Sequence, residues 1–363
     1  MLEASAQPVM VPGWLRRWPA WSTYAAMAWS MIYGALALSW AAGAPGFPFG
    51  EGDPEGAAMG SVLFAVPAEP TGLVMAGWCA AGVIVAGAMR RPTSHRRRRR
   101  VLLAVAWCFA VTMLLVIPDI RLLQNLAYGL LFVFVKLDGA VLNQGAIELG
   151  GIFWAMTAIS YRRNHVGAGT GRREAKVAAN RSPALMRWAK IATYAAFLLP
   201  LPYGITRLAW ALGVPLGIDQ ERSGNALTAR IGEAGLATLA IGGGTVTLGL
   251  IRPWGEEVWP RWVPFLAGQR VPVALPTILG GVAALAITVG GLAFVRLAII
   301  GALGLAPEPA EPPAYTGWAT WAPGWLWPFW GIALAVATIA YYHRRHDQGR
   351  AAAGPRLGRG APC

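Results

Sequence analysis

Charged residues are scarce in this 363-residue chain, where Asp, Glu, Lys and Arg together make up 13% of the sequence. Ordinary soluble domains carry about 25%. This scarcity, with repeated apolar runs of roughly 20 residues, excludes a soluble or disordered protein. Cysteine is scarce as well, since three cysteines cannot staple a chain this long and Cys79 and Cys108 lie inside apolar runs. The sequence therefore predicts an integral membrane protein.

Motifs of several catalytic classes are also absent. The sequence has no Gly-x-x-x-x-Gly-Lys-Ser/Thr loop for ATP hydrolysis, no His-Glu-x-x-His and no Gly-x-Ser-x-Gly. All four histidines fall in predicted cytoplasmic segments: His95, His165, His343 and His346. That placement argues against haem or a metal site within the membrane. We therefore expect no cofactor and no metal, and no residue is assigned a catalytic role.

Eight apolar segments are long enough to cross a bilayer as helices. They lie at about 20–42, 70–89, 101–118, 146–161, 190–213, 232–251, 272–293 and 323–342. Residues 122–144 hold an apolar run that is too short to cross and would invert every later crossing, so they are expected to form an outer amphipathic or re-entrant segment. Pro200 and Pro202 predict a kink or unwound turn in the fifth span.

The net charge of +14 follows from topology. With the N-terminus in the cytoplasm, 25 of the 31 basic residues are cytoplasmic, and 12 of the 17 acidic residues are outside. This is the positive-inside pattern, so both termini should be cytoplasmic and nucleic acid is not expected as a partner. One cluster is denser than topology requires and can hold anionic lipid head groups. It consists of Arg96, Arg97, Arg98, Arg99 and Arg100.

An internal repeat divides the chain into halves. An offset of 170 aligns Thr23-Tyr24-Ala25-Ala26 with Thr193-Tyr194-Ala195-Ala196, and further identities surround this match. An even number of spans per half gives both halves the same orientation, so the prediction is two parallel four-helix repeats. We expect repeats at 1–165 and 187–346, a basic cytoplasmic linker at 166–186 and a flexible cytoplasmic tail at 347–363. The outer segments 43–69, 122–144 and 297–322 are either a lid or plain connecting loops.

A mixed inner motif runs from Arg252 to Pro264 and combines tryptophans and arginines with Glu256 and Glu257. It is interpreted as an interfacial salt-bridge cluster, with acid–base chemistry as the alternative. This motif and the Tyr203–Gly213 stretch resemble uncharacterised multi-pass membrane proteins of actinobacterial type. The resemblance covers most of the second half; it implies a bacterial plasma membrane and no particular activity.

Charged residues near the membrane are costly and are therefore the candidate site. Five are expected to be ligand-binding, lining an outward polar chamber between the bundles: Arg207, Arg121, Arg296, Glu148 and Glu233. The alternative is that they reach the head groups or pair as structural salt bridges.

Three functions remain open. The first is a protein that binds or translocates an amphiphilic anionic molecule, with the three arginines as counter-charges. The second is a lipid-modifying enzyme with Glu148, Glu233 or Asp119 as acid or base. The third is a structural or regulatory subunit of a membrane complex, with a membrane protein partner or a second copy of the chain.

Overall fold

The computed structural model describes residues 17–91, 93, 95–132, 138–166, 186–218, 220–221, 227–255, 271–305 and 315–352. Within these ranges the regular secondary structure is helical apart from a two-residue antiparallel ladder between β1 (Gln220–Glu221) and β2 (Tyr315–Thr316). The prediction of a helical protein is thus confirmed.

The chain forms two compact units. The first unit comprises Met1–Val177 and Val289–Pro313, and the second comprises Ala178–Thr288 and Ala314–Cys363. The long helix α10 (Ala274–Ala302) therefore contributes its first part to the second unit and its second part to the first. This differs from a division into sequence halves, and the two-repeat arrangement stays a prediction. Most of the expected linker lies outside the described residues.

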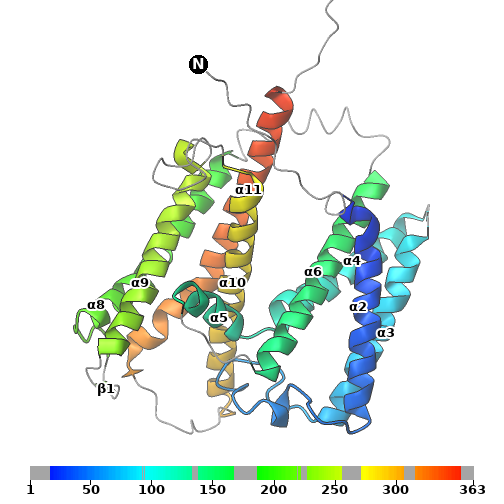
Figure 1. Cartoon of the computed structure of the whole chain (residues 1–363), viewed down its shortest axis with the longest axis horizontal. Helices are drawn as coiled ribbons and strands as arrows, with labels where there is room; N and C mark the ends of the chain where they lie inside the picture. Colours follow the sequence, from blue (N-terminus) through cyan, green and yellow to red (C-terminus); the bar gives the residue numbers. More distant parts are fainter. Residues whose placement is uncertain are drawn as a thin grey trace, which may run out of the picture. The chain divides into compact units, whose positions relative to one another are not determined.

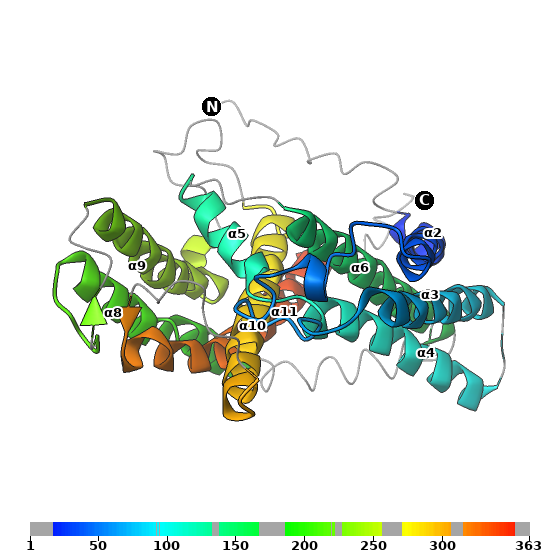
Figure 2. The same cartoon turned by 90° about the horizontal axis from the view of Figure 1, so that it is seen from below.

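Four long helices form the body of the first unit (Figures 1 and 2). They are α2 (Trp18–Ala41), α3 (Ala68–Arg90), α4 (Arg96–Val111) and α6 (Gly139–Val166). Helix α2 packs against α3 and α6, and α4 packs against both α3 and α6. A π-helical turn, η2 (Thr112–Val116), continues α4, and a short helix, α5 (Arg121–Leu130), precedes α6. A short 3-10 turn, η1 (Gly50–Gly52), lies in the segment between α2 and α3.

The segment before α6 has the predicted amphipathic pattern, but α6 begins earlier than predicted. Helix α5 is short and strongly one-sided, as an amphipathic outer segment should be. Helix α6, however, begins at Gly139 rather than near 146. The reason is a cap, because the backbone N–H of Val141 donates to Oδ1 of Asp138 at 2.9 Å.

Aromatic side chains form much of the core of the first unit. Trp154 is fully buried and stacks on Phe109 with ring centroids 4.5 Å apart. A second series runs from α2 into the following loop, where Tyr33, Trp40 and Phe47 meet edge to face at centroid distances of 5.9 and 5.7 Å. Because such pairs stabilise beyond the area they bury, they fix the loop against the end of α2.

The second unit contains a helix over residues 186–198, α8 (Leu201–Ala211), α9 (Leu227–Thr247), the first part of α10, and α11 (Trp327–Ala352). Four 3-10 turns join these elements: η3 (Leu248–Leu250), η4 (Pro253–Gly255), η5 (Trp318–Thr320) and η6 (Ala322–Leu326). The predicted break in the fifth span is confirmed, since residues 199–200 form a turn between two helices. Proline lacks the N–H that a continuous helix would need there.

Five helices in the described ranges are long and apolar enough to cross a membrane. They are Ala68–Arg90, Arg96–Val116, Leu227–Leu250, Ala274–Ala302 and Trp318–Gln348. The other three predicted spans are helical as well but less suited by composition or length. Helix α2 is rich in Trp, Tyr and Ser, α6 carries Asn143, Gln144 and Glu148, and the fifth span is interrupted at Pro200. Five such helices indicate a multi-pass membrane protein, and eight crossings stay a prediction.

Two helices run beyond the ends of their predicted membrane spans. Helix α10 runs on to Ala302 rather than ending near 293, and α11 continues to Ala352, into the segment predicted as a flexible tail. Neither stretch contains a proline to stop the helix. Of the inner motif, Arg252–Gly255 is described, whereas residues 256–270, with Glu256 and Glu257, lie outside the described residues.

Close helix approach in the first unit depends on Gly72. A Cβ atom at Gly72 would lie 2.7 Å from the backbone oxygen of Ala37 and 2.7 Å from the nitrogen of Ala41 in α2. A Cβ at Gly77 on the same helix would meet nothing within 4 Å. Membrane helices pack mainly through such small residues.

We therefore expect Gly72→Ala to lower the free energy of unfolding by about 1–3 kcal/mol, because α2 must shift away from α3. Gly77→Ala is the matched control and should be neutral or slightly stabilising, since alanine favours the helix. Thermal unfolding of both variants in mild detergent checks this. Equal stability of the two would show that α2 does not lie against α3 at this position.

Candidate functional site

Arg121 is buried between two carboxylates in the first unit. It is 4% exposed, and Asp119 and Asp53 are 0% and 7% exposed. Its Nε and Nη2 donate to Asp119, with Nη2–Oδ2 at 2.8 Å, and its Nη1 donates to Oδ1 of Asp53 at 3.1 Å. Nη2 also donates to Oδ2 of Asp53. Asp53 comes from the loop after α2, so this cluster ties residues 43–69 to the start of α5.

The two carboxylates stabilise the charged guanidinium of Arg121. Burial alone would lower its pKa, but the hydrogen bonds that it donates to Asp53 and Asp119 and their negative charges outweigh burial and raise that pKa. A buried ion pair adds little over an apolar replacement, yet loss of one partner leaves an uncompensated charge. The cluster therefore fixes where the loop lies.

Arg296, on the part of α10 that belongs to the first unit, binds backbone carbonyl groups. Its Nη1 donates to the oxygen of Pro118 at 2.7 Å and its Nη2 to that of Leu115 at 2.6 Å, with a longer bond of 3.3 Å to Gly60. The π-helical turn and Pro118 disrupt the regular hydrogen bonding at the end of α4. The guanidinium of Arg296 supplies donors to the carbonyls released there.

Glu148 lies in the first unit on α6. Its Oε1 is buried and has no hydrogen-bond partner among the described residues. The negative charge of Asp119 is close enough to repel a charge on Glu148. Asp53 and Asp119 balance Arg121 and Arg296 in charge, so Glu148 is the additional acid of this group. It makes no ion pair in the described part of the chain.

Arg207 and Glu233 form an ion pair in the second unit. Nη1 of Arg207 on α8 lies 2.9 Å from Oε2 of Glu233 on α9, and the two side chains are 18% and 11% exposed. The guanidinium also lies over two rings of its own helix, 4.9 Å from the centroid of Tyr203 and 4.6 Å from that of Trp210. These contacts join α8 to α9 at one position.

The five predicted site residues thus fall into two groups. Arg121, Arg296 and Glu148 belong to the first unit, together with Asp119, and Arg207 and Glu233 belong to the second. Four of the five hold another charged side chain or a backbone carbonyl. This geometry agrees with the alternative to ligand binding, in which these residues form structural salt bridges. Their role in ligand binding stays a prediction.

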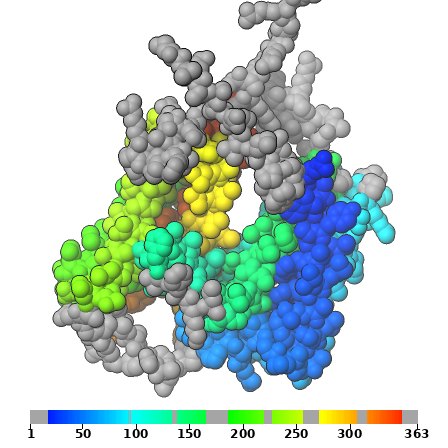
Figure 3. Space-filling view, viewed as in Figure 1, coloured from blue at the N-terminus to red at the C-terminus, as the bar shows by residue number. Residues whose placement is uncertain are grey.

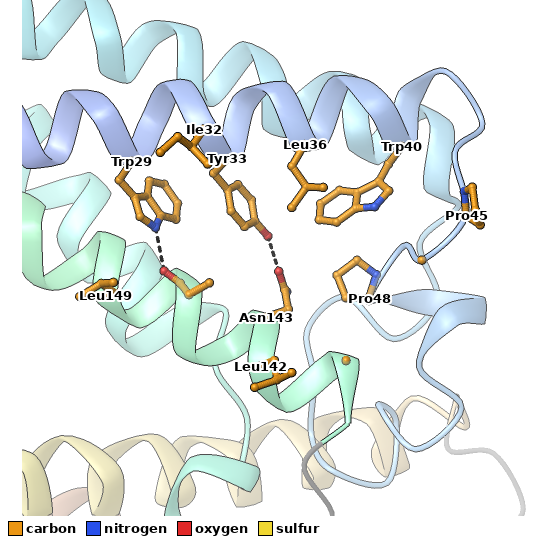
Figure 4. Close-up of a pocket in the computed structure, with 13 residues that line it drawn as sticks. Trp29, Ile32, Tyr33, Leu36, Trp40, Pro45, Pro48, Leu142, Asn143 and Leu149 are labelled. Carbon is orange, nitrogen blue, oxygen red and sulfur yellow. Dashed lines mark hydrogen bonds between the residues drawn. The ribbon is translucent and has the colours of Figure 1, made fainter.

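A groove of about 530 Å³ lies between α2 and α6 in the first unit. Figure 4 shows Trp29, Tyr33 and Trp40 projecting from α2 along it, with Pro45 and Pro48 beyond the end of that helix. Tyr33 and Trp40 are 6% and 4% exposed and form its floor, whereas Ile32 and Leu142, from α2 and α6, are 73% and 64% exposed and form its edges. The volume is in the range of small-molecule sites.

Two hydrogen bonds fix the aromatic floor to α6. Nε1 of Trp29 donates to the backbone oxygen of Ala146 at 2.8 Å, and the hydroxyl of Tyr33 donates to Oδ1 of Asn143 at 2.9 Å. The Nδ2 group of Asn143 is buried and has no partner among the described residues. A donor left in this state costs free energy, which a ligand with a carbonyl or hydroxyl oxygen would recover.

Sequence reasoning missed this groove. In the space-filling view the surfaces of α2, in dark blue, and α6, in green, lie side by side (Figure 3). One signal was present, because Trp29, Tyr33, Leu36 and Trp40 recur at helical spacing and share a face. That pattern is equally typical of a buried packing face, and only the structure shows that α6 leaves it partly uncovered.

The fold and these sites define a helical membrane protein with an apolar lateral groove and internally paired charges. Comparison of the chain with protein-family models, with curated proteins and with solved structures found no match.

Replacement of Asp53 tests the Arg121 cluster. Asp53→Asn leaves Arg121 with one carboxylate in a buried site, so we expect the free energy of unfolding to fall by about 3 kcal/mol. Glu55→Gln, at an exposed acid of the same loop, should change it by less than about 0.5 kcal/mol. Chemical unfolding and limited proteolysis within 43–69 would measure both, and equal behaviour of the two variants would contradict the structural role.

A double-mutant cycle tests the pair in the second unit. Arg207→Gln and Glu233→Gln should each destabilise the protein, and the double variant should lose less than the sum, with a coupling of about 1–3 kcal/mol. Arg207→Lys keeps the charge but loses the flat guanidinium over Tyr203 and Trp210, so it should retain only part of the coupling. Strict additivity would mean that the two side chains do not interact.

Proposed function

We propose that the protein is a multi-pass protein of a bacterial plasma membrane, with both termini cytoplasmic, that binds a lipid-like amphiphile in the groove between α2 and α6. The observation that carries the proposal is the groove itself, which is lined by aromatic and aliphatic side chains and has a buried amide donor that finds no partner in the described part of the chain. The apolar chain of the ligand lies along Trp29, Tyr33 and Trp40, and an oxygen atom of its polar part accepts from Asn143.

The lipid bilayer around these helices determines which class of ligand is available to the groove. A groove on the side of a membrane bundle opens to the bilayer, where acyl and isoprenoid chains are the available apolar ligands. The groove spans the half of α2 nearer to the acidic loop 43–69, which is the outer half in the predicted topology. An amphiphile from the outer leaflet therefore reaches it without crossing the membrane.

The proposal moves the ligand away from the predicted arginine counter-charges. Arg121 and Arg207 are already paired with carboxylates, and Arg296 is bound to carbonyl groups. An anionic ligand at these arginines would have to displace those partners, whereas a chain in the groove displaces none. Of the three acids that the acid–base alternative names, Asp119 and Glu233 are held in ion pairs, which leaves Glu148 as its candidate.

One observation favours the alternative of a subunit in a membrane complex. Trp318, Trp321 and Trp325 in the second unit are exposed by 52%, 53% and 42%. Exposed aromatic residues occur at protein interfaces and also in the belts that membrane proteins present to head groups. A test for a ligand bound in the groove separates the two alternatives, because a structural subunit needs no ligand there.

Native mass spectrometry of the detergent-extracted protein tests the proposal. We expect a bound small molecule in wild type, and Ala146→Phe, which fills the groove, should lower its occupancy about tenfold, equivalent to about 1.4 kcal/mol. Ala81→Phe is the matched control, because Ala81 is exposed on α3 outside the groove. Asn143→Leu removes both the Nδ2 donor and the acceptor of the Tyr33 hydroxyl, so it should weaken binding as well.

Arg207→Ala discriminates between the two ligand sites. If the adduct persists in this variant and disappears in Ala146→Phe, the groove binds it. If the adduct instead disappears in Arg207→Ala and persists in Ala146→Phe, the ligand binds at the predicted arginine. No adduct in wild type, with no cross-linking of a photoreactive phosphatidylcholine to residues 29–40 or 139–149, would rule out the groove and favour the subunit.

A further inference from the structure

Arginine side chains gather at one end of the first unit. Helices α2 and α4 begin at this end, and α3 and α6 end there (Figure 1). Nine arginines at these four helix ends are exposed: Arg17, Arg90, Arg91, Arg96, Arg97, Arg98, Arg100, Arg162 and Arg163. We call these nine residues the arginine collar. The sequence draws attention to Arg96–Arg100 alone, and the structure adds the other three helix ends.

The two ends of the unit differ sharply in charge. The Asp and Glu residues in its described part are Glu51, Asp53, Glu55, Glu69, Asp119, Asp138 and Glu148. They lie in the loop after α2, at the start of α3, before or within the first half of α6, or at the end of the η2 turn, and so none is at the collar end. The collar therefore concentrates positive charge without a carboxylate of the described part of the unit to offset it.

Aromatic rings hold two of the collar guanidinium groups in place. Nη2 of Arg90 donates to the hydroxyl of Tyr24 at 2.8 Å, and its Cζ lies 4.2 Å from the centroid of that ring. Arg163 lies 5.3 Å from the ring centroid of Trp18. Tyrosine and tryptophan favour the level of lipid head groups, so these contacts place the guanidinium groups at the height where phosphates lie.

We propose that the arginine collar binds the phosphate groups of anionic phospholipids in the leaflet on its side of the membrane. A planar guanidinium group can form two parallel hydrogen bonds with one phosphate. Several arginines from four helix ends can therefore hold a small number of lipids against the bundle. This goes beyond setting orientation, which requires positive charge but retains no lipid.

The probe is phosphatidylglycerol, compared with phosphatidylcholine, in mixed detergent micelles in which orientation has no effect. We expect wild type to retain phosphatidylglycerol in native mass spectra at least about tenfold more than phosphatidylcholine, with retention falling as salt rises. Changing Arg96, Arg97, Arg98 and Arg100 together to Gln should abolish most of this preference. Changing the same four to Lys should preserve the salt-sensitive part of it.

A variant with only two substitutions controls for the possibility that the four-Gln variant fails to insert into the membrane. Arg97→Gln with Arg98→Gln leaves the other seven collar residues in place and should lower the preference by several-fold while thermal unfolding stays unchanged. Equal retention of phosphatidylglycerol by wild type and the four-Gln variant would overturn the proposal. Equal retention of the two lipids by wild type would overturn it as well. The arginine collar would then serve only to set the orientation of the protein in the membrane.

Discussion

The peptide between Pro118 and Asp119 is the point on which the first unit depends. Two arginines from distant parts of the sequence meet there: Arg296 donates to the carbonyl of Pro118, and Arg121 is paired with Asp119. The helix breaks at this point because Pro118 has no N–H and η2 is wound as a π-helix. Since buried polar groups must be satisfied in a membrane protein, the break requires these donors, and Asp53 extends the network to the outer loop.

The same network fixes the loop at one end of the groove. The loop after α2 is held at Asp53 by Arg121 and at Phe47 by Trp40, so Pro45 and Pro48 stay at the end of the aromatic floor. At the acidic end of the unit Asp53, Asp119 and Arg121 are paired internally, whereas the arginines of the collar are exposed. The two ends of one bundle therefore differ, since one contains the internal charge network and the other exposes nine arginines.

Particular residues show how far sequence reasoning reached. The break at Pro200 was predicted correctly, because a missing N–H acts locally. Of the two alternatives for residues 122–144, amphipathic or re-entrant, the amphipathic one agrees with the one-sided pattern of α5. The start of α6 was predicted seven residues late, because its signal is the single cap at Asp138. Arg121 and Arg296 fall in different predicted repeats, at 1–165 and 187–346, yet both belong to the first unit, because the second part of α10 belongs to that unit.

Sequence by itself determined that this is a helical membrane protein, where most of its helices lie and how its charge divides between their two ends. These properties follow from composition and from contacts between residues near in the chain. Only the tertiary structure decided which carboxylate neutralises which arginine, that Tyr33 bonds to Asn143, and that α2 and α6 leave a groove between them. Tyr33 and Asn143 are 110 positions apart, and no local pattern selects among the many partners of equal chemistry.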